Sequence, residues 1–216
     1  MQFPEGETQG IAGLDDFTYV ATVKGISVLN GGQVIAQEET TFTPTTIAIN
    51  PANLGEFAVG GTDVPSSTIP SDHEYSVHIY SFANSEITHK QELRFRSEVT
   101  CLSYSTKGDI LAAGYASSHI VLYSASADGY QLLSDKFSFH NGRIKTLAFN
   151  ASGTHLLSGS LDTDVYVWAV PGRGGSGKIK IAGASGDGVY GVGWIGEKRI
   201  VTTGHDAAVK IWDVAI

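Results

Sequence analysis

His140, Ser158 and Asp162 are the residue types that serve as base, nucleophile and orienting acid in a serine hydrolase. In many such enzymes the serine stands in a strained Gly-x-Ser-x-Gly turn between a strand and a helix. Ser158 instead follows two leucines and precedes Gly159-Ser160, and no helical periodicity comes after it. We therefore predict no catalytic residue, and a hydrolase acting through these three side chains is the alternative.

A glycine-rich run from Gly172 to Lys178 has the spacing Gly-x-x-x-x-Gly-Lys, one residue short of a phosphate-binding loop. The position that needs Ser or Thr to bind Mg²⁺ is occupied by Ile179. Residues 178–181 alternate as a strand does, so no helix N-terminus is expected to face a phosphate. We predict a flexible hairpin loop and no cofactor, and a nucleotide-binding enzyme is the alternative.

The run from Thr62 to Glu74 contains two prolines and three serines, which indicates a loop. His73 and Glu74, with His78 nearby, are possible metal ligands, but no second cluster has metal-ligand spacing, so no metal is predicted. Long loops on a rigid scaffold often carry binding contacts. A solvated loop without a partner is the alternative, and the predicted partner-binding residues are Asp63, Asp72, His73 and Glu74.

The elements that position these residues are β-strands in a repeated unit. From Ser158 to Val170 the sequence indicates a strand, a tight turn and a second strand, in which Tyr166 and Trp168 alternate with small apolar residues. The same pattern returns from Thr202 to Val214, and Trp168 and Trp212 lie about 44 residues apart. Weaker copies occur at residues 120–123, 77–80 and 26–29.

This period predicts an all-β fold, because repeats of roughly 40–45 residues with four strands each are typical of WD-repeat β-propeller blades. We predict about five four-stranded blades of an incomplete propeller that normally has seven. Because an open sheet edge favours aggregation, we expect the rest of the propeller to come from a parent protein. The predicted blades cover residues 7–40, 41–93, 94–137, 138–183 and 184–216, the last of them without its outer strand.

The composition argues against several function classes. The chain has 14 basic and 22 acidic residues, and this net charge of −8 argues against binding to a nucleic-acid backbone. No apolar run approaches the roughly 20 residues of a membrane span, and residues 1–7 lack the features of a signal peptide. The single cysteine, Cys101, lies in an apolar run, which suits a reducing compartment. We therefore expect a cytoplasmic protein that binds neither nucleic acid nor membrane.

The sequence resembles WD repeats in a further respect, the structural tetrad of hydrogen-bonded His, Ser or Thr, Asp and Trp side chains. The fifth unit has Ala184 at the position of the histidine. The resemblance implies that these residues stabilise the blades, since a buried indole N–H and a buried carboxylate need partners. The matching residues are His140, Ser158, Asp162 and Trp168 in the fourth unit, and Thr202, Asp206 and Trp212 in the fifth.

The chain as a whole resembles the C-terminal propeller of the actin-interacting protein 1 family. Residues 128–130, 158–168 and 191–212 carry this resemblance, together with residues 49–51 and 58–61. It implies a cytoplasmic protein of the actin cytoskeleton, located at actin patches or the cell cortex. Its implied partners are actin filaments and ADF/cofilin, and its implied function is to promote filament disassembly and to cap barbed ends.

The same resemblance implies a protein without enzymatic activity. Members of the family have two seven-bladed propellers, so this chain would correspond to about five blades of the second. A WD-repeat scaffold for another multiprotein complex is the alternative, because a fold does not fix a function.

Overall fold

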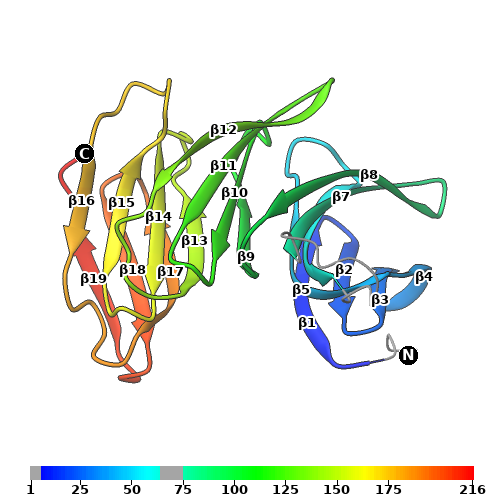
Figure 1. Cartoon of the computed structure of the whole chain (residues 1–216), viewed down its shortest axis with the longest axis horizontal. Coiled ribbons are helices and arrows are strands. Elements are labelled where there is room, and N and C mark those ends of the chain that lie inside the picture. The colour runs from blue at the N-terminus through cyan, green and yellow to red at the C-terminus, as the bar shows by residue number, and fades with distance from the viewer. Residues whose placement is uncertain (1–5, 64–74) are drawn as a thin grey trace. The chain divides into compact units, whose positions relative to one another are not determined.

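The computed structural model describes residues 6–63 and 75–216, and all regular structure in these residues is β-strand (Figure 1). The strands form five antiparallel sheets, which confirms the predicted all-β class. The chain divides into two compact units, one formed by residues 1–102 and the other by residues 103–216.

The first unit contains two four-stranded sheets in which sequence neighbours are also spatial neighbours. Two-residue turns produce this order in the first sheet. Gly31 and Gly32 join β3 to β4 with φ values of 56° and 80°, and such two-residue turns match the twist of an antiparallel hairpin. The strands are β1 (Thr8–Leu14), β2 (Phe17–Thr22), β3 (Gly25–Asn30) and β4 (Gln33–Glu39), then β5 (Phe42–Ile49), β6 (Glu56–Asp63), β7 (Tyr75–Ala83) and β8 (Glu86–Phe95).

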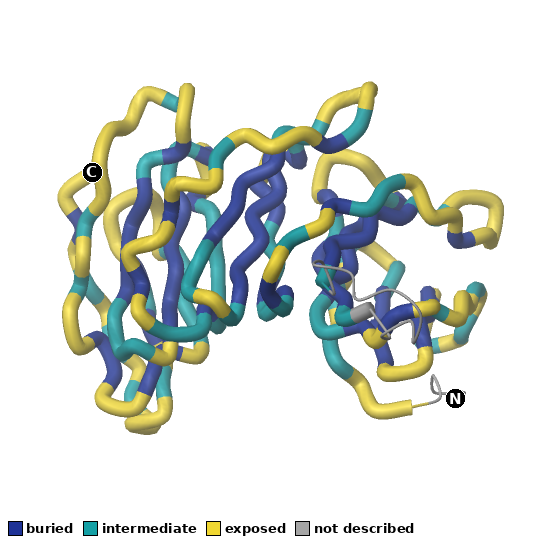
Figure 2. The backbone as a smooth tube through the Cα atoms, viewed as in Figure 1, coloured by how far each residue is buried: buried dark blue, intermediate teal, exposed yellow. Residues whose placement is uncertain are grey.

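The core of the first unit is formed by apolar side chains from both of its sheets. Phe57 is fully buried, and its ring centroid lies 4.9 Å from that of Tyr19 on the other sheet. Figure 2 shows the middle strands as buried and the hairpin ends as exposed. The other buried members of this core are Ala21, Ile26, Val28, Phe42, Ile47, Val59, Tyr80 and Ile87.

Close packing requires two adjacent glycines in β6. A Cβ atom on Gly60 would lie 2.6 Å from Val99 Cγ1, and one on Gly61 would lie 2.2 Å from Phe42 Cδ2. Both distances are much shorter than an ordinary carbon–carbon contact of about 3.5–4.0 Å. The Gly-Gly pair therefore lets the neighbouring side chains pack directly against the strand backbone.

The second unit contains the strands that follow, and the sequence boundary between the units falls within β9. Two sheets have four strands and the last has three. The first is formed by β9 (Val99–Tyr104), β10 (Ile110–Tyr115), β11 (Ile120–Ser126) and β12 (Gly129–Phe137). The second is formed by β13 (Ile144–Phe149), β14 (His155–Ser160), β15 (Val165–Ala169) and β16 (Lys178–Ile181), and the third by β17 (Val189–Ile195), β18 (Arg199–Gly204) and β19 (Val209–Asp213).

The three-stranded sheet buries one of its faces and exposes apolar groups on the other. Val189 and Ile200 pack with Leu157 of the preceding sheet in one core cluster, which Trp212 joins from β19. In contrast, Val209 and Ile211 are 71% and 60% exposed. No strand of the described residues pairs with the outer edge of β19, so the edge and its apolar side chains are both open to association.

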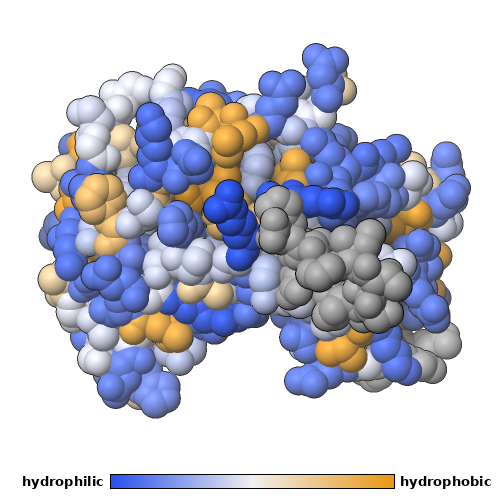
Figure 3. All heavy atoms as spheres, viewed as in Figure 1, coloured by the Kyte–Doolittle hydropathy of each residue, from blue (hydrophilic) through white to orange (hydrophobic). Residues whose placement is uncertain are grey.

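On the face that Figure 3 shows, hydrophilic residues predominate and apolar residues form small groups. Scattered exposed apolar residues are normal for a folded protein. The part of the chain that the structure describes contains no helix long and apolar enough to cross a membrane.

Candidate functional site

Four of the residues singled out in the sequence are joined by hydrogen bonds inside the second unit. His140 lies between β12 and β13, Ser158 on β14, Asp162 in the turn after β14, and Trp168 on β15. His140 Nδ1 lies 2.8 Å from Asp162 Oδ2, and His140 Nε2 lies 2.8 Å from Ser158 Oγ. Trp168 Nε1 also lies 2.8 Å from Ser158 Oγ. Side chains from two strands and two connecting segments thus form one continuous chain.

The chemistry of the donors fixes the direction of this chain. The indole N–H of Trp168 can only donate, so Ser158 Oγ accepts from it and donates its own proton to His140 Nε2. His140 Nδ1–H then donates to the Asp162 carboxylate, which only accepts when ionised. Every group is satisfied when the imidazole is neutral.

The electrostatic environment favours this neutral form. Burial lowers the pKa of His140, and the opposing effect of the Asp162 carboxylate is smaller. Burial alone would raise the pKa of Asp162, but the backbone N–H groups of Asn141 and Asp164 and the side chain of His140 together outweigh it and hold that pKa below its usual value. An ionised carboxylate beside a neutral imidazole is the state that the hydrogen bonds require.

The distances match those of a hydrolase triad, but the surroundings of Ser158 do not. Ser158 is 0% exposed, and its oxygen already accepts the Trp168 N–H. A nucleophile must reach its substrate, and its oxygen must be free to attack. No substrate can approach Ser158 in this fold, so the geometry favours a stabilising link over a catalytic triad.

Aromatic rings surround this link. The Tyr166 ring lies 4.9 Å from that of Trp168 at an interplanar angle of 24°, and 4.7 Å from the His140 ring at 86°. Phe137 packs edge-on against Trp168 at 5.2 Å. These rings exclude water from the polar chain, which strengthens its hydrogen bonds.

The fifth unit contains a different version of the link. Trp212 Nε1 donates to Thr202 Oγ1 at 3.0 Å, as Trp168 donates to Ser158. Asp206, however, does not bind a histidine. Lys210 Nζ lies 2.7 Å from Asp206 Oδ2 and 2.9 Å from the backbone oxygen of Ala184. The hydrogen bond from Lys210 to Asp206 lowers the pKa of Asp206. Lys210 thus connects the turn to the segment in which the histidine is absent.

Lys210 was missed by the sequence reasoning, although the sequence contains a signal for it. Lys210 and Trp212 occupy alternate positions of β19, so they lie on the same face of the strand. A lysine at a core-facing position of a strand needs an acidic or carbonyl partner. Asp206, four residues earlier, was the available carboxylate.

A second polar link connects the last two sheets at the turns Asn150–Ser152 and Gly196–Lys198, and it was also missed. Asn150 is fully buried, and its Nδ2 lies 2.6 Å from Glu197 Oε2. The same oxygen of Glu197 lies 2.9 Å from Ser152 Oγ, and Ser152 N donates to Glu197 Oε1 at 3.2 Å. The sequence signal was an Asn followed by a Ser-Gly turn directly after a strand, but its partner lies far along the chain.

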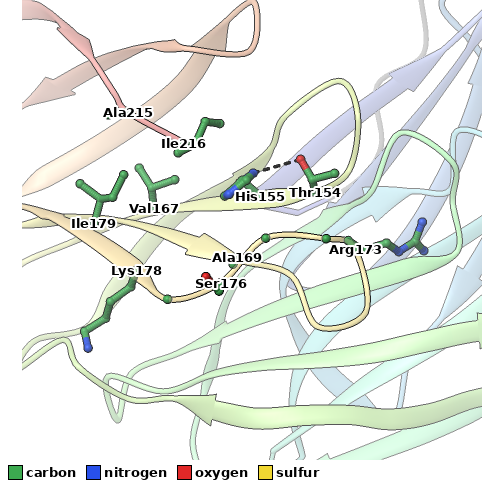
Figure 4. A pocket seen from close by; sticks show the side chains of 13 residues that line it. Thr154, His155, Val167, Ala169, Arg173, Ser176, Lys178, Ile179, Ala215 and Ile216 are labelled. Atoms are coloured by element: carbon green, nitrogen blue, oxygen red, sulfur yellow. Dashed lines mark hydrogen bonds between the residues drawn. The ribbon is translucent and has the colours of Figure 1, made fainter.

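The glycine-rich run has no phosphate-binding context. Strand β16, and no helix, follows Lys178. Lys178 Nζ lies 3.3 Å above the centroid of the Phe139 ring, and Arg173 forms an ion pair with Asp109. The loop borders a pocket of about 460 Å³ whose floor includes Val167 and Ile179, and Figure 4 shows both cationic side chains directed away from it. The structure therefore gives no support to a nucleotide site.

The metal and loop predictions are only partly covered by the structure. Asp72, His73 and Glu74 lie outside the described residues, and of Asp63 only the backbone at the end of β6 is described. His78 is buried on β7, where Nδ1 lies 3.3 Å from His89 Nε2 and the ring stacks on Phe42 at 3.7 Å. Within residues 6–63 and 75–216, no three potential ligands form a metal-binding group.

His78 predicts a pH dependence of stability. Burial, with His89 as a second cause, lowers the pKa of His78 to about 4. An unfolded histidine titrates near 6.5, so the unfolded state binds more protons as the pH falls. The contribution of the neutral His78 side chain to the free energy of unfolding is therefore fully present above pH 6.5. It is lost progressively as the pH falls toward 4. Between pH 7.5 and pH 5 the first unit should lose about 2 kcal/mol, measured by denaturant unfolding followed by circular dichroism.

The matched variant for this experiment is His78→Gln, which retains hydrogen-bonding groups but does not titrate. It should flatten the slope of stability against pH in this range. An unchanged slope in the variant would show that the acid sensitivity arises elsewhere.

Comparison with known proteins places these features in a family of repeats. The family described as "WD domain, G-beta repeat" matches residues 88–130 and 131–169. The second match contains all four residues of the His140–Trp168 chain. The chain therefore contains WD repeats, and its five antiparallel sheets are consistent with part of a propeller.

Several longer proteins are similar to almost the whole chain. An uncharacterised WD repeat-containing protein of Schizosaccharomyces pombe is 32% identical over 98% of this chain and 33% of its own length. Actin-interacting protein 1 of Drosophila melanogaster is 28% identical over 90% of this chain and 30% of its own. WD repeat-containing protein 1 of Gallus gallus is 31% identical over 83% of this chain and 27% of its own length. The chain is thus a WD-repeat protein related to these proteins, and it spans about a third of their length.

Proposed function

We propose that this chain is a non-catalytic segment of an actin-cytoskeleton protein, one that contacts actin filaments together with ADF/cofilin and promotes filament disassembly and barbed-end capping. The observation that carries the proposal is the similarity over 90% of the chain to a protein named for its interaction with actin. The proposal includes a cytoplasmic location on the actin cytoskeleton.

The structure supports the non-catalytic part of the proposal. The Ser, His and Asp side chains that could perform hydrolysis are buried and fully engaged with one another and with Trp168. Rigid sheets with polar loops at their ends are suited to binding another protein, because loops held by a scaffold lose little entropy on binding.

Cosedimentation with filaments tests the proposal. The 216-residue chain should pellet with actin filaments in a saturable manner, and more of it should pellet when the filaments carry cofilin. Because the chain spans about a third of its relatives, we expect filament binding with little depolymerisation by the chain alone. The control is the chain centrifuged without filaments.

Two outcomes would contradict the proposal. One is a chain that stays in the supernatant at every filament concentration, with or without cofilin. The other is an affinity purification from cell extract that recovers a different multiprotein complex and no actin, which would favour the general WD-repeat scaffold.

A further inference from the structure

The glycine-rich loop that joins β15 to β16 contains an arginine between two glycines. Arg173 is preceded by Gly172 and followed by Gly174, and a third glycine comes directly after them. No other arginine of the chain has a glycine on both sides; the others are Arg94, Arg96, Arg143 and Arg199. Arginines in such glycine-rich segments are typical substrates of protein arginine methyltransferases, which modify the guanidinium group. The sequence of the loop therefore matches the substrate of such an enzyme.

The backbone on either side of Arg173 is open to an approaching enzyme. Gly172 and Gly174 have φ values of 74° and 86°, a conformation that glycine adopts readily and other residues rarely do. Within the described part of the chain, a Cβ atom added to either glycine would meet no heavy atom within 4 Å other than those of its chain neighbours. An enzyme can therefore contact the loop backbone directly, without displacing packed side chains.

The strands that flank the loop are held independently of its tip. Ala169 N, at the end of β15, donates to the backbone oxygen of Gly177 at 3.1 Å. Arg173 N donates to the backbone oxygen of Val170 at 3.2 Å. The first of these bonds closes the base of the loop just before β16 begins. The tip can therefore be drawn into an active site while the sheet remains folded.

One ion pair restrains the Arg173 side chain. Its Nη2 contacts Oδ2 of Asp109, in the turn before β10 of the neighbouring sheet, and the other carboxylate oxygen accepts from Ser105 Oγ at 2.9 Å. The Arg173 and Asp109 side chains are 26% and 38% exposed, so the pair borders water. Figure 4 shows the Arg173 side chain directed away from the pocket beneath the loop. A pair of this kind is weak, and breaking it would slow a reaction of Arg173 by at most about fivefold.

From these contacts we propose that Arg173 is a methylation site and that Asp109 restrains it. The methyl donor is S-adenosylmethionine, whose sulfonium S–C bond breaks as an N–C bond forms at a terminal guanidinium nitrogen. That nitrogen releases one proton, so the product keeps its positive charge but has fewer N–H donors. Methylation at Nη2 therefore weakens the contact with Asp109 and frees the loop from the neighbouring sheet. The proposal does not depend on actin being a partner.

Methyl transfer to the purified 216-residue chain tests the site. The probes are a protein arginine methyltransferase that modifies glycine–arginine segments and S-adenosylmethionine with a radioactive methyl group. Mass spectrometry, after digestion by a protease that does not cleave at arginine, should locate one or two methyl groups on Arg173 and none on the other arginines. Arg173→Lys should abolish incorporation. Arg143→Lys is the matched control, because Arg143 also follows a glycine but directly precedes β13, and it should leave incorporation unchanged.

Asp109→Asn tests the restraint, because it removes the charge that holds the guanidinium. The initial rate of methylation should rise about two- to fivefold. Asp128→Asn, in the exposed turn between β11 and β12 of the same sheet, is the matched control and should leave the rate unchanged. Thermal unfolding of each variant shows whether it is folded. A chain without label at Arg173, label spread equally over all the arginines, or equal rates in Asp109→Asn and Asp128→Asn would overturn the proposal.

Discussion

Replacing Asp162 with alanine should lower the free energy of unfolding of the second unit by about 2–4 kcal/mol, because each buried donor that loses its acceptor costs about 1–3 kcal/mol. The substitution leaves His140 Nδ1–H and the backbone N–H groups of Asn141 and Asp164 without their acceptor. All three tryptophans, at positions 168, 194 and 212, belong to the second unit. Tryptophan fluorescence during urea unfolding therefore reports on this unit alone.

The matched control is Asp206→Ala in the next sheet. Asp206 stands in the equivalent turn, but its carboxylate is more exposed and binds Lys210, whose ammonium also remains accessible to water. Surface pairs of this kind contribute little to stability. We therefore expect a much smaller change than in Asp162→Ala. Similar losses in both variants would mean that the His140 chain has no special role.

Replacing Trp168 with alanine should also lower the free energy of unfolding of the second unit by about 3–5 kcal/mol. Trp168 is 3% exposed, and its ring contacts those of Phe137 and Tyr166. The substitution leaves a cavity among these rings and removes the donor to Ser158 Oγ. The same urea experiment measures the loss through Trp194 and Trp212.

Trp168→Phe separates the two causes. Phenylalanine keeps most of the ring packing but has no N–H, so it should lose about 1–3 kcal/mol, the cost of an unsatisfied buried group together with a smaller ring. If Trp168→Ala and Trp168→Phe were equally stable, the packing of the ring would contribute nothing, contrary to this account.

The strands could be predicted from the sequence because their signal is local. The alternation of Val165, Val167 and Ala169 with Tyr166 and Trp168 is a property of five adjacent residues, and the structure has β15 at these positions. The candidate residues of the fourth unit could be identified because each keeps the residue type of a known repeat pattern. In the structure they form one chain of hydrogen bonds.

The substitute within that pattern had only part of its signal nearby in the sequence, the carboxylate of Asp206 four residues before Lys210. Lys210 binds both Asp206 and the backbone at Ala184, and its role depends on a segment from the start of the same repeat. The link from Asn150 to Glu197 joins turns of two different sheets. This contact forms only when the two sheets pack together, because Glu197 lies far from Asn150 along the chain.

Surface sites were the least predictable. The sequence pointed to the loop from Thr62 to Glu74, most of which lies outside the described residues, so that prediction is still open. Leu161, Tyr190 and His205, from three separate parts of the chain, instead lie close together at the ends of the last two sheets. A tyrosine in an alternating strand is expected to be buried as often as not, and its exposure here follows from its place at the end of β17.

A double-mutant cycle between His140 and Asp162 tests the central claim most directly, which is that these two side chains act together to stabilise the fold. The urea unfolding of the wild-type chain, His140→Ala, Asp162→Ala and the double variant is measured under one set of conditions. The account predicts that the double variant loses less stability than the sum of the single variants, with a coupling of at least about 1 kcal/mol. Losses that add to within about 0.3–0.5 kcal/mol would contradict it.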